Sequence, residues 1–254
     1  MRLVVHQLRF EFKRFWRDPQ SVFFTVALPI VFLVIFAGIF GNDTLESRGD
    51  LKVSTYYVPG IVALGVMSAG FVGLAISIVE QRERGILKRL RSTPLPPRAY
   101  IAGRAGTAAA LSLLVTAALV LVGRLAYGVR VPGAALPGLL VTLVLGTACF
   151  ASLGFALSGV IRSANAAPAV TNGITLPLQM ISGIFFPIDQ LPAGLLGIAK
   201  VFPVYHLAQG LLDGFDPAGP AGGFGWGHLA VLAAWTVAGL ALASRTFRWE
   251  PRTS

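Results

Sequence analysis

The residues of this chain that can engage a soluble partner gather in one charged segment, which runs from Glu80 to Pro94. Hydrophobic residues make up 55% of the 254 residues and charged residues only 13%, so this run of charge stands out. Three aliphatic residues, Ile86, Leu87 and Leu90, fall on one side of the segment if it is helical. A solvated helix does not require such a side. The pattern therefore predicts docking onto a protein or lipid surface, or packing against the chain's own apolar helices.

Residue patterns that support catalysis or nucleotide binding do not occur in the sequence. No lysine follows a glycine, which excludes a phosphate-cradling P-loop. The histidines His6, His206 and His228 are too scattered to predict a metal site, and the nucleophile pattern Gly-x-Ser-x-Gly is missing. The one cysteine, Cys149, is interpreted as a small buried apolar residue. We therefore expect no catalytic residue, no cofactor-binding residue and no metal site, and the chain is not predicted to be an enzyme.

Long charge-free stretches predict the elements that must position the charged segment. A helix needs about 20 apolar residues to cross a bilayer. Helix is expected there because the backbone finds no water to bond. Six spans are predicted, at about residues 22–40, 56–79, 105–123, 136–160, 166–186 and 228–244. The chain is thus predicted to be an all-α membrane protein whose membrane domain covers residues 21–254.

The distribution of lysine and arginine predicts the orientation of these spans. With six spans, 16 of the 21 basic residues fall on one side of the membrane. The positive-inside rule places that side, and with it both termini, in the cytoplasm. The net charge of +10 then reflects contact with anionic lipid head groups, without nucleic acid. No ionisable residue lies clearly in the middle of a span, which argues against an ion-coupled carrier.

The first twenty residues carry an apolar and a basic stripe at helical spacing. The apolar stripe consists of Val4, Leu8, Phe12 and Phe15, and basic residues lie beside it. This arrangement predicts a cytoplasmic amphipathic helix over residues 1–20 that lies in the membrane interface. Pro19 ends it because proline disfavours helix in the residue before it. A frayed cytoplasmic tail is the alternative.

The charged segment opens a cytoplasmic loop, residues 80–98, which is also predicted to be helical. Glu80 and Arg84 are one helical turn apart, a spacing that favours an ion pair. Pro94, Pro96 and Pro97 end the helix and return the chain to the membrane.

The fifth span and the segment after it are interrupted by prolines and glycines. Pro187 follows the fifth span, and residues 188–212 are broken by Pro192, Gly197 and Pro203. Neither half of that segment can cross about 30 Å of hydrocarbon. The pattern predicts a short helical hairpin in the outer leaflet, which either gates substrate release or caps the bundle. Aromatic residues such as Phe71, Phe150 and Phe155 either line a substrate path or simply pack between helices.

Three stretches resemble the permease subunits of type-2 ABC exporters, and the similarity covers essentially the whole chain. The first is Arg17-Asp18-Pro19 followed by Phe24 to Pro29 and an aliphatic span. The second has an acidic start, a glycine, spaced leucines and a Ser/Thr-Pro exit: Glu80, Glu83, Gly85, Leu87, Leu90, Ser92, Thr93 and Pro94. The third runs from Ile181 to Pro187, with Leu191-Pro192 and Phe202-Pro203-Val204-Tyr205 following. The drug-resistance branch, similar to daunorubicin exporter permeases, is the favoured subgroup.

The resemblance implies a bacterial cell-membrane permease that works as a dimer of six-span units. Each unit would pair with a separate ABC ATPase, which binds the ATP and drives an amphiphilic drug, antibiotic or lipid-like substrate outward. The charged segment would act as a coupling helix, which transmits movement from that ATPase. Its contact residues would be Glu80, Glu83, Arg84, Gly85, Leu87, Lys88 and Leu90, and the two leucines would fill an apolar cleft on the ATPase. The interfacial helix would help to form the docking platform. The outer hairpin and gate would depend on Gly183, Pro187, Pro192 and Pro203.

Two other classes of function stay open at this point. An energy-independent channel or a secondary carrier is one, although the uncharged spans count against ion coupling. A membrane scaffold or assembly factor is the other, because the apolar side of the charged segment suits a client as well as an ATPase. The second permease is either a copy of this chain or a paralogue.

Overall fold

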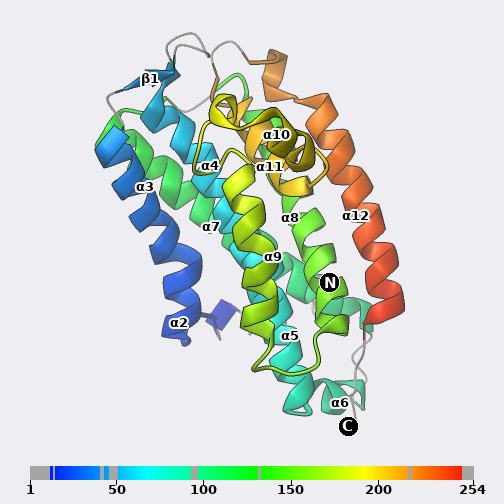
Figure 1. Cartoon of the computed structure of the whole chain (residues 1–254). Helices are drawn as coiled ribbons and strands as arrows, with labels where there is room; N and C mark the ends of the chain where they lie inside the picture. Colours follow the sequence, from blue (N-terminus) through cyan, green and yellow to red (C-terminus); the bar gives the residue numbers. More distant parts are fainter. Residues whose placement is uncertain are drawn as a thin grey trace.

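The structure is a computed structural model that describes residues 12–13, 15–40, 43–45, 51–92, 97–130, 133–216 and 219–247 (Figure 1). Most of the predicted interfacial helix, residues 1–20, lies outside these ranges. The proline exit of the charged loop, at residues 93–96, also lies outside them.

The described residues form a bundle of long apolar helices. Five are long and apolar enough to cross a membrane, or up to six if one bent pair of short helices counts as a span. The first combines α2 (Pro19–Val22), the π-helical η1 (Phe23–Ala27) and α3 (Leu28–Phe40), and the second combines α4 (Val53–Met67), the π-helical η3 (Ser68–Gly73) and α5 (Leu74–Glu83). The others are α7 (Pro97–Tyr127), α8 (Leu136–Val160) and α12 (Trp226–Thr246). The predicted all-α class and five of the predicted spans are confirmed, with boundaries shifted by a few residues.

The predicted fifth span, residues 166–186, is wrong in its length. The helix found there, α9, runs from Ala167 to Ile181 and has 15 residues. At 1.5 Å per residue it reaches about 22 Å, short of the roughly 30 Å of hydrocarbon. The helix ends before Gly183, whose φ of +80° lies in the left-handed region that favours glycine.

Two short helices follow α9 and fill the place of the predicted hairpin over residues 188–212. A 3-10 turn, η4 (Ile188–Gln190), leads to α10 (Ala193–Ala199) and α11 (Pro203–Leu212). The axes of α10 and α11 differ by 95° across the break between them. The prediction of two short helices, neither able to span the membrane alone, is confirmed. A further 3-10 turn, η5 (Ala221–Gly223), precedes α12.

The charged and the hairpin-bearing ends of the bundle lie opposite each other. Figure 1 shows α6 (Ile86–Arg91) at the lower end of the bundle, where α12 also ends, whereas β1 and α10 lie at the upper end. The strand β1 (Thr44–Leu45) pairs antiparallel with β2 (Leu51–Lys52) in the first connection. Loops therefore alternate between the two ends, as the predicted topology requires.

Close packing of α8 against α12 depends on glycines at the contact. A Cβ atom added to Gly239 of α12 would lie 2.2 Å from Ser152 Oγ of α8, and one added to Gly159 would lie 2.2 Å from the Thr246 carbonyl oxygen. Small residues let helices approach where no hydrophobic force draws them together in lipid. Large apolar side chains on the outer sides, such as Phe23, Val144 and Val237, are exposed and suit contact with lipid.

Replacing Gly239 with valine is expected to destabilise the bundle by about 1–3 kcal/mol, because the added atoms overpack the α8–α12 contact. Denaturation of the purified chain by SDS measures the loss. The matched control is Gly227→Val on the same helix, where an added Cβ meets nothing within 4 Å. Equal stability of the two variants would contradict the close approach of α8 and α12.

Candidate coupling site

A glycine divides the charged segment into two helices. The second long helix continues through Glu80 and Glu83, and α6 begins only at Ile86. Between them Gly85 adopts a φ of +69°, the left-handed conformation that commonly ends a helix. The charged segment is therefore helical on both sides of Gly85 but forms two helices, a break that was not predicted. Glu80 and Glu83 extend the membrane span, whereas Lys88 and Leu90 belong to a separate short helix.

The apolar side of α6 packs against the protein itself. Leu87 is 0% exposed and lies in a cluster with five other buried side chains. The other members are Leu74, Ile78, Tyr100, Ala108 and Phe155. Leu90 is half-buried and packs against the same cluster. The expectation that Leu87 fills a cleft on a partner is thus wrong, because its side chain is already enclosed. The polar side of α6, with Lys88, Arg89 and Arg91, is exposed.

Three consecutive side chains at the end of α5 bind three different elements. The hydroxyl of Tyr100 on α7 donates a hydrogen bond to Gln81 Oε1 at 3.2 Å. The Arg82 guanidinium donates to the carbonyl oxygens of Ser158, at 2.7 Å, and Ile161 at the end of α8. The backbone N–H of Ala164 donates to Glu83 Oε2 at 2.7 Å. A movement of α5 is therefore transmitted to α7, to the end of α8 and to the connection that leads into α9.

Arg82 is the strongest of these connections. Its side chain is only 2% exposed and carries a positive charge into the protein. The last carbonyl groups of a helix have no partner within it and sit at the negative end of the helix dipole. A guanidinium suits that position because it presents several N–H donors in a fixed plane. Arg82 was expected only to contribute, with the other basic residues, to the orientation of the spans, and its contact with α8 was not predicted.

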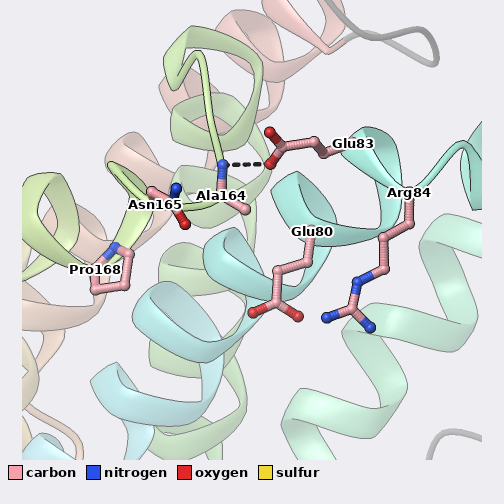
Figure 2. Close-up of a pocket in the computed structure, with 6 residues that line it drawn as sticks. All are labelled: Glu80, Glu83, Arg84, Ala164, Asn165 and Pro168. Atoms are coloured by element: carbon pink, nitrogen blue, oxygen red, sulfur yellow. Dashed lines mark hydrogen bonds between the residues drawn. The ribbon is translucent and has the colours of Figure 1, made fainter.

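A polar cleft of about 540 Å³ lies beside this junction. Glu80, Glu83 and the following Arg84 line it at the end of α5, and Ala164, Asn165 and Pro168 line it at the start of α9 (Figure 2). In Figure 2 the Glu83 carboxylate points to Ala164, while the charged ends of Glu80 and Arg84 extend away from it and toward each other. Two carboxylates and a guanidinium here can bind polar groups of either charge on a soluble surface.

The predicted gate residues gather at the opposite end. Gly183 lies in a turn that two hydrogen bonds join to α4. The Tyr56 hydroxyl donates a hydrogen bond to the Gly183 carbonyl oxygen, and the Tyr57 hydroxyl donates one to the Phe185 carbonyl oxygen at 3.3 Å. Pro187 and Pro192 immediately precede η4 and α10, and Pro203 is the first residue of α11. The four residues therefore mark the ends of short elements, and whether they gate a substrate stays a prediction.

An apolar pocket of about 170 Å³ lies under the bend between α10 and α11. Phe71, Phe150 and Trp235 line it together with Phe202 at the bend. Two of the three aromatic residues named as candidates for a substrate path therefore share one pocket. The third, Phe155, instead packs in the cluster around Leu87.

A multi-pass helical bundle of this kind, with a charged junction at one end, defines an integral membrane protein. The family model of the ABC-2 type transporter matches residues 3–215. The chain belongs to that family and is the membrane permease subunit of an ABC transporter, a class in which a separate subunit carries the ATPase.

Curated relatives of the same class cover most of the chain. A putative transport permease of Bacillus subtilis, YvfS, is 22% identical over 89% of this chain and 89% of its own length. The daunorubicin resistance ABC transporter permease protein DrrB1 of Streptomyces coeruleorubidus is 28% identical over 78% of this chain and 68% of its own. A probable doxorubicin resistance permease protein of Mycobacterium tuberculosis, DrrC, is 27% identical over 82% and 74%.

Proposed function

We propose that this chain is the membrane-spanning subunit of an ATP-driven exporter that moves an amphiphilic drug, antibiotic or lipid-like substrate outward. Two of the similar permeases carry daunorubicin or doxorubicin resistance in their names, which supports export of an amphiphilic compound. The outward direction and the substrate class go beyond the family membership itself.

The observation that carries the proposal is the junction at the end of α5. Leu87 anchors α6 among buried side chains of α5, α7 and α8, so a force that an ATPase exerts on the exposed basic side of α6 also displaces these helices. The same movement reaches the α8–α9 connection through Arg82 and Glu83. The helix α9 forms part of the wall of the apolar pocket, through Ile174, Thr175 and Leu178. A displacement of α6 is thus transmitted through packed contacts to the apolar pocket, which suits an apolar group of a substrate.

The predicted partners and location follow from this arrangement. The ATPase binds the ATP and contacts Lys88 and Arg89 of α6, together with the polar cleft at Glu80, Glu83 and Arg84. A second permease, either a copy of this chain or a paralogue, completes the transporter. The α6 end faces the cytoplasm of a bacterial cell, because it carries most of the described basic residues.

Reversing the charge of α6 tests the proposal. We expect Lys88→Glu combined with Arg89→Glu to abolish ATP-dependent uptake of doxorubicin into inside-out membrane vesicles and co-purification of a P-loop ATPase with the tagged chain. Both side chains are exposed, so insertion and folding should persist. The matched control is Arg245→Glu, an exposed basic residue in the last turn of α12. Wild-type ATPase recovery with the double variant would contradict the docking role of α6.

A further inference from the structure

The second span contains one wide turn between two regular helices. The turn is the π-helical η3 (Ser68–Gly73), with α4 before it and α5 after it. A π-helix pairs an N–H with the carbonyl group five residues back, whereas an α-helix pairs it with the fourth. The wide turn therefore holds about one residue more than the α-helical turn that it replaces. Such π turns are rare inside α-helices and frequently lie at functional sites.

The half of this span that lies toward the hairpin end, α4, is fixed in the bundle. Every residue of α4 is buried. The Tyr56 hydroxyl donates a hydrogen bond to the Gly183 carbonyl oxygen in the turn after α9. The Tyr57 hydroxyl donates one to the Phe185 carbonyl oxygen in the same turn. At the hairpin end, α4 and the turn after α9 are therefore joined.

The other half of the span, α5, is joined to a different set of elements. Glu83 accepts a hydrogen bond from the backbone N–H of Ala164, which leads into α9. Leu87 of α6 packs against Leu74 of α5. The Arg82 guanidinium adds the last carbonyl groups of α8. At the α6 end, α5 is therefore joined to α6, to the last turn of α8 and to the start of α9, and only η3 separates it from α4.

The neighbouring helix α9 is weakened beside the same pocket. Pro177 lies inside α9 and has no N–H, so the Gly173 carbonyl oxygen lacks the helical partner that residue 177 would otherwise supply. A Cβ atom added to Gly173 would meet nothing within 4 Å, which leaves room for a bend. The turn η3 packs against α9, and Phe71 and Leu178 both line the apolar pocket. Two adjacent helices, joined at both ends, therefore have their weak points side by side.

Glycines on both sides form the contact between η3 and α8. A Cβ atom added to Gly154 of α8 would lie 2.8 Å from the Gly70 carbonyl oxygen and 3.1 Å from that of Phe71. One added to Gly70 would lie 3.3 Å from the Cβ atom of Phe150. Such small residues let helix backbones approach closely. Because neither glycine carries a side chain that interlocks with the other helix, a change in the turn requires little repacking at this contact.

We propose that η3 and Pro177 form a paired hinge, at which α5 and the first half of α9 tilt together against α4 and the turn after α9. Phe71 belongs to η3 and lines the apolar pocket, so the tilt changes the wall of that pocket. The inference rests on the proposed function only in treating the pocket as a site for an apolar group of the substrate. The hinge itself belongs to this chain and is measured without an ATPase.

Fluorine-19 NMR of the full chain in nanodiscs tests the hinge directly. Trifluoromethylphenylalanine replaces Phe71 alone, beside a pocket whose volume of about 170 Å³ accommodates the added group. We expect relaxation dispersion to show exchange of this probe between two states, on the microsecond to millisecond timescale of helix motions. The matched control places the same probe at Phe36, whose ring contacts Tyr57 and Phe185 beyond the hinge, and it should show no exchange. Absence of exchange at residue 71 would overturn the proposal.

Deleting single residues separates a hinge from a merely structural turn. Without Gly73 the shortened segment forms a regular α-helical turn, so resistance to SDS should persist while the exchange of the Phe71 probe is lost. The matched control deletes Ser77 within α5, which turns the end of that helix by about 100° and displaces Arg82 and Glu83 from their partners. Stability should then be lost. Equal instability of the two deletions, or exchange that survives in a stable chain without Gly73, would contradict the hinge.

Transport supplies a readout of the mechanical consequence. The chain without Gly73 should keep ATPase recovery and ATP hydrolysis, because α6 is unchanged, but lose most of its ATP-dependent doxorubicin uptake. Pro177→Ala restores the helical donor to Gly173 and should reduce both the exchange at Phe71 and the uptake. Wild-type uptake by the chain without Gly73 would refute the role of the hinge in transport. If the wild-type chain itself takes up no doxorubicin, the proposed function fails, and the fluorine spectra alone decide whether the hinge exists.

Discussion

Replacing Arg82 with methionine is expected to cost about 3 kcal/mol of folding free energy, because two carbonyl groups lose a charged donor. Methionine keeps most of the side-chain length, so the change isolates the hydrogen bonds to Ser158 and Ile161. Those carbonyl groups end α8, which packs against α12 and much of the remaining bundle. SDS denaturation of the purified chain measures the loss.

The same change should also impair transport, since Arg82 joins α5 to α8. The matched control is Arg84→Met, two residues further on, where the side chain is exposed and lines the polar cleft. We expect Arg84→Met to leave stability unchanged while it weakens binding of the ATPase. If Arg82→Met is as stable as Arg84→Met, the buried guanidinium does not hold α8.

The difference between Arg82 and Arg84 shows what the sequence can and cannot predict at this site. Both are arginines in the same charged run, and composition assigns them the same orienting role. Only the direction of each side chain at the end of α5 separates them, and that direction depends on where α8 ends in space. The contact between Glu83 and Ala164 was beyond prediction for the same reason, because 81 residues separate the partners.

Helices and breaks that depend only on the residues within a segment were predicted well. Runs of apolar residues must be helical in lipid, so the long helices follow from the absence of charge. Pro192 and Pro203 divide the hairpin because proline cannot continue a helix from the preceding turn. The fifth span was predicted too long because its apolar character continues past Ile181, whereas the helix ends where Gly183 turns and Tyr56 binds its carbonyl oxygen.

The pairing of His206 with His228 illustrates a further limit. The three histidines are scattered along the chain, and their positions in the sequence do not predict that two of the rings meet. The packing of α11 against α12 nevertheless brings His206 and His228 together, with their Nδ1 atoms 2.9 Å apart. The path of the chain between these two helices cannot be derived from residue spacing, so neither can this contact.

Truncating Leu87 to alanine is expected to uncouple ATP hydrolysis from transport while the ATPase still binds. The side chain is fully enclosed between α5, α7 and α8, and removing such a leucine typically costs about 2–5 kcal/mol. The cavity loosens α6 from the core, so that a push on α6 no longer moves α5 as one body. The exposed Lys88 and Arg89 are untouched, and the docking surface therefore persists.

The measurement compares ATP hydrolysis with ATP-dependent doxorubicin uptake in the same inside-out vesicles. Leu87→Ala should retain hydrolysis and ATPase recovery but lose most of the uptake, whereas Leu87→Met, which keeps the volume, should retain both. The charge reversal at Lys88 and Arg89 gives a different pattern, in which ATPase recovery and hydrolysis are lost together with the uptake. Loss of ATPase recovery in Leu87→Ala would mean that this leucine shapes the docking surface. Wild-type uptake would mean that α6 needs no anchor, and the path from α6 through Arg82 would then have to be abandoned.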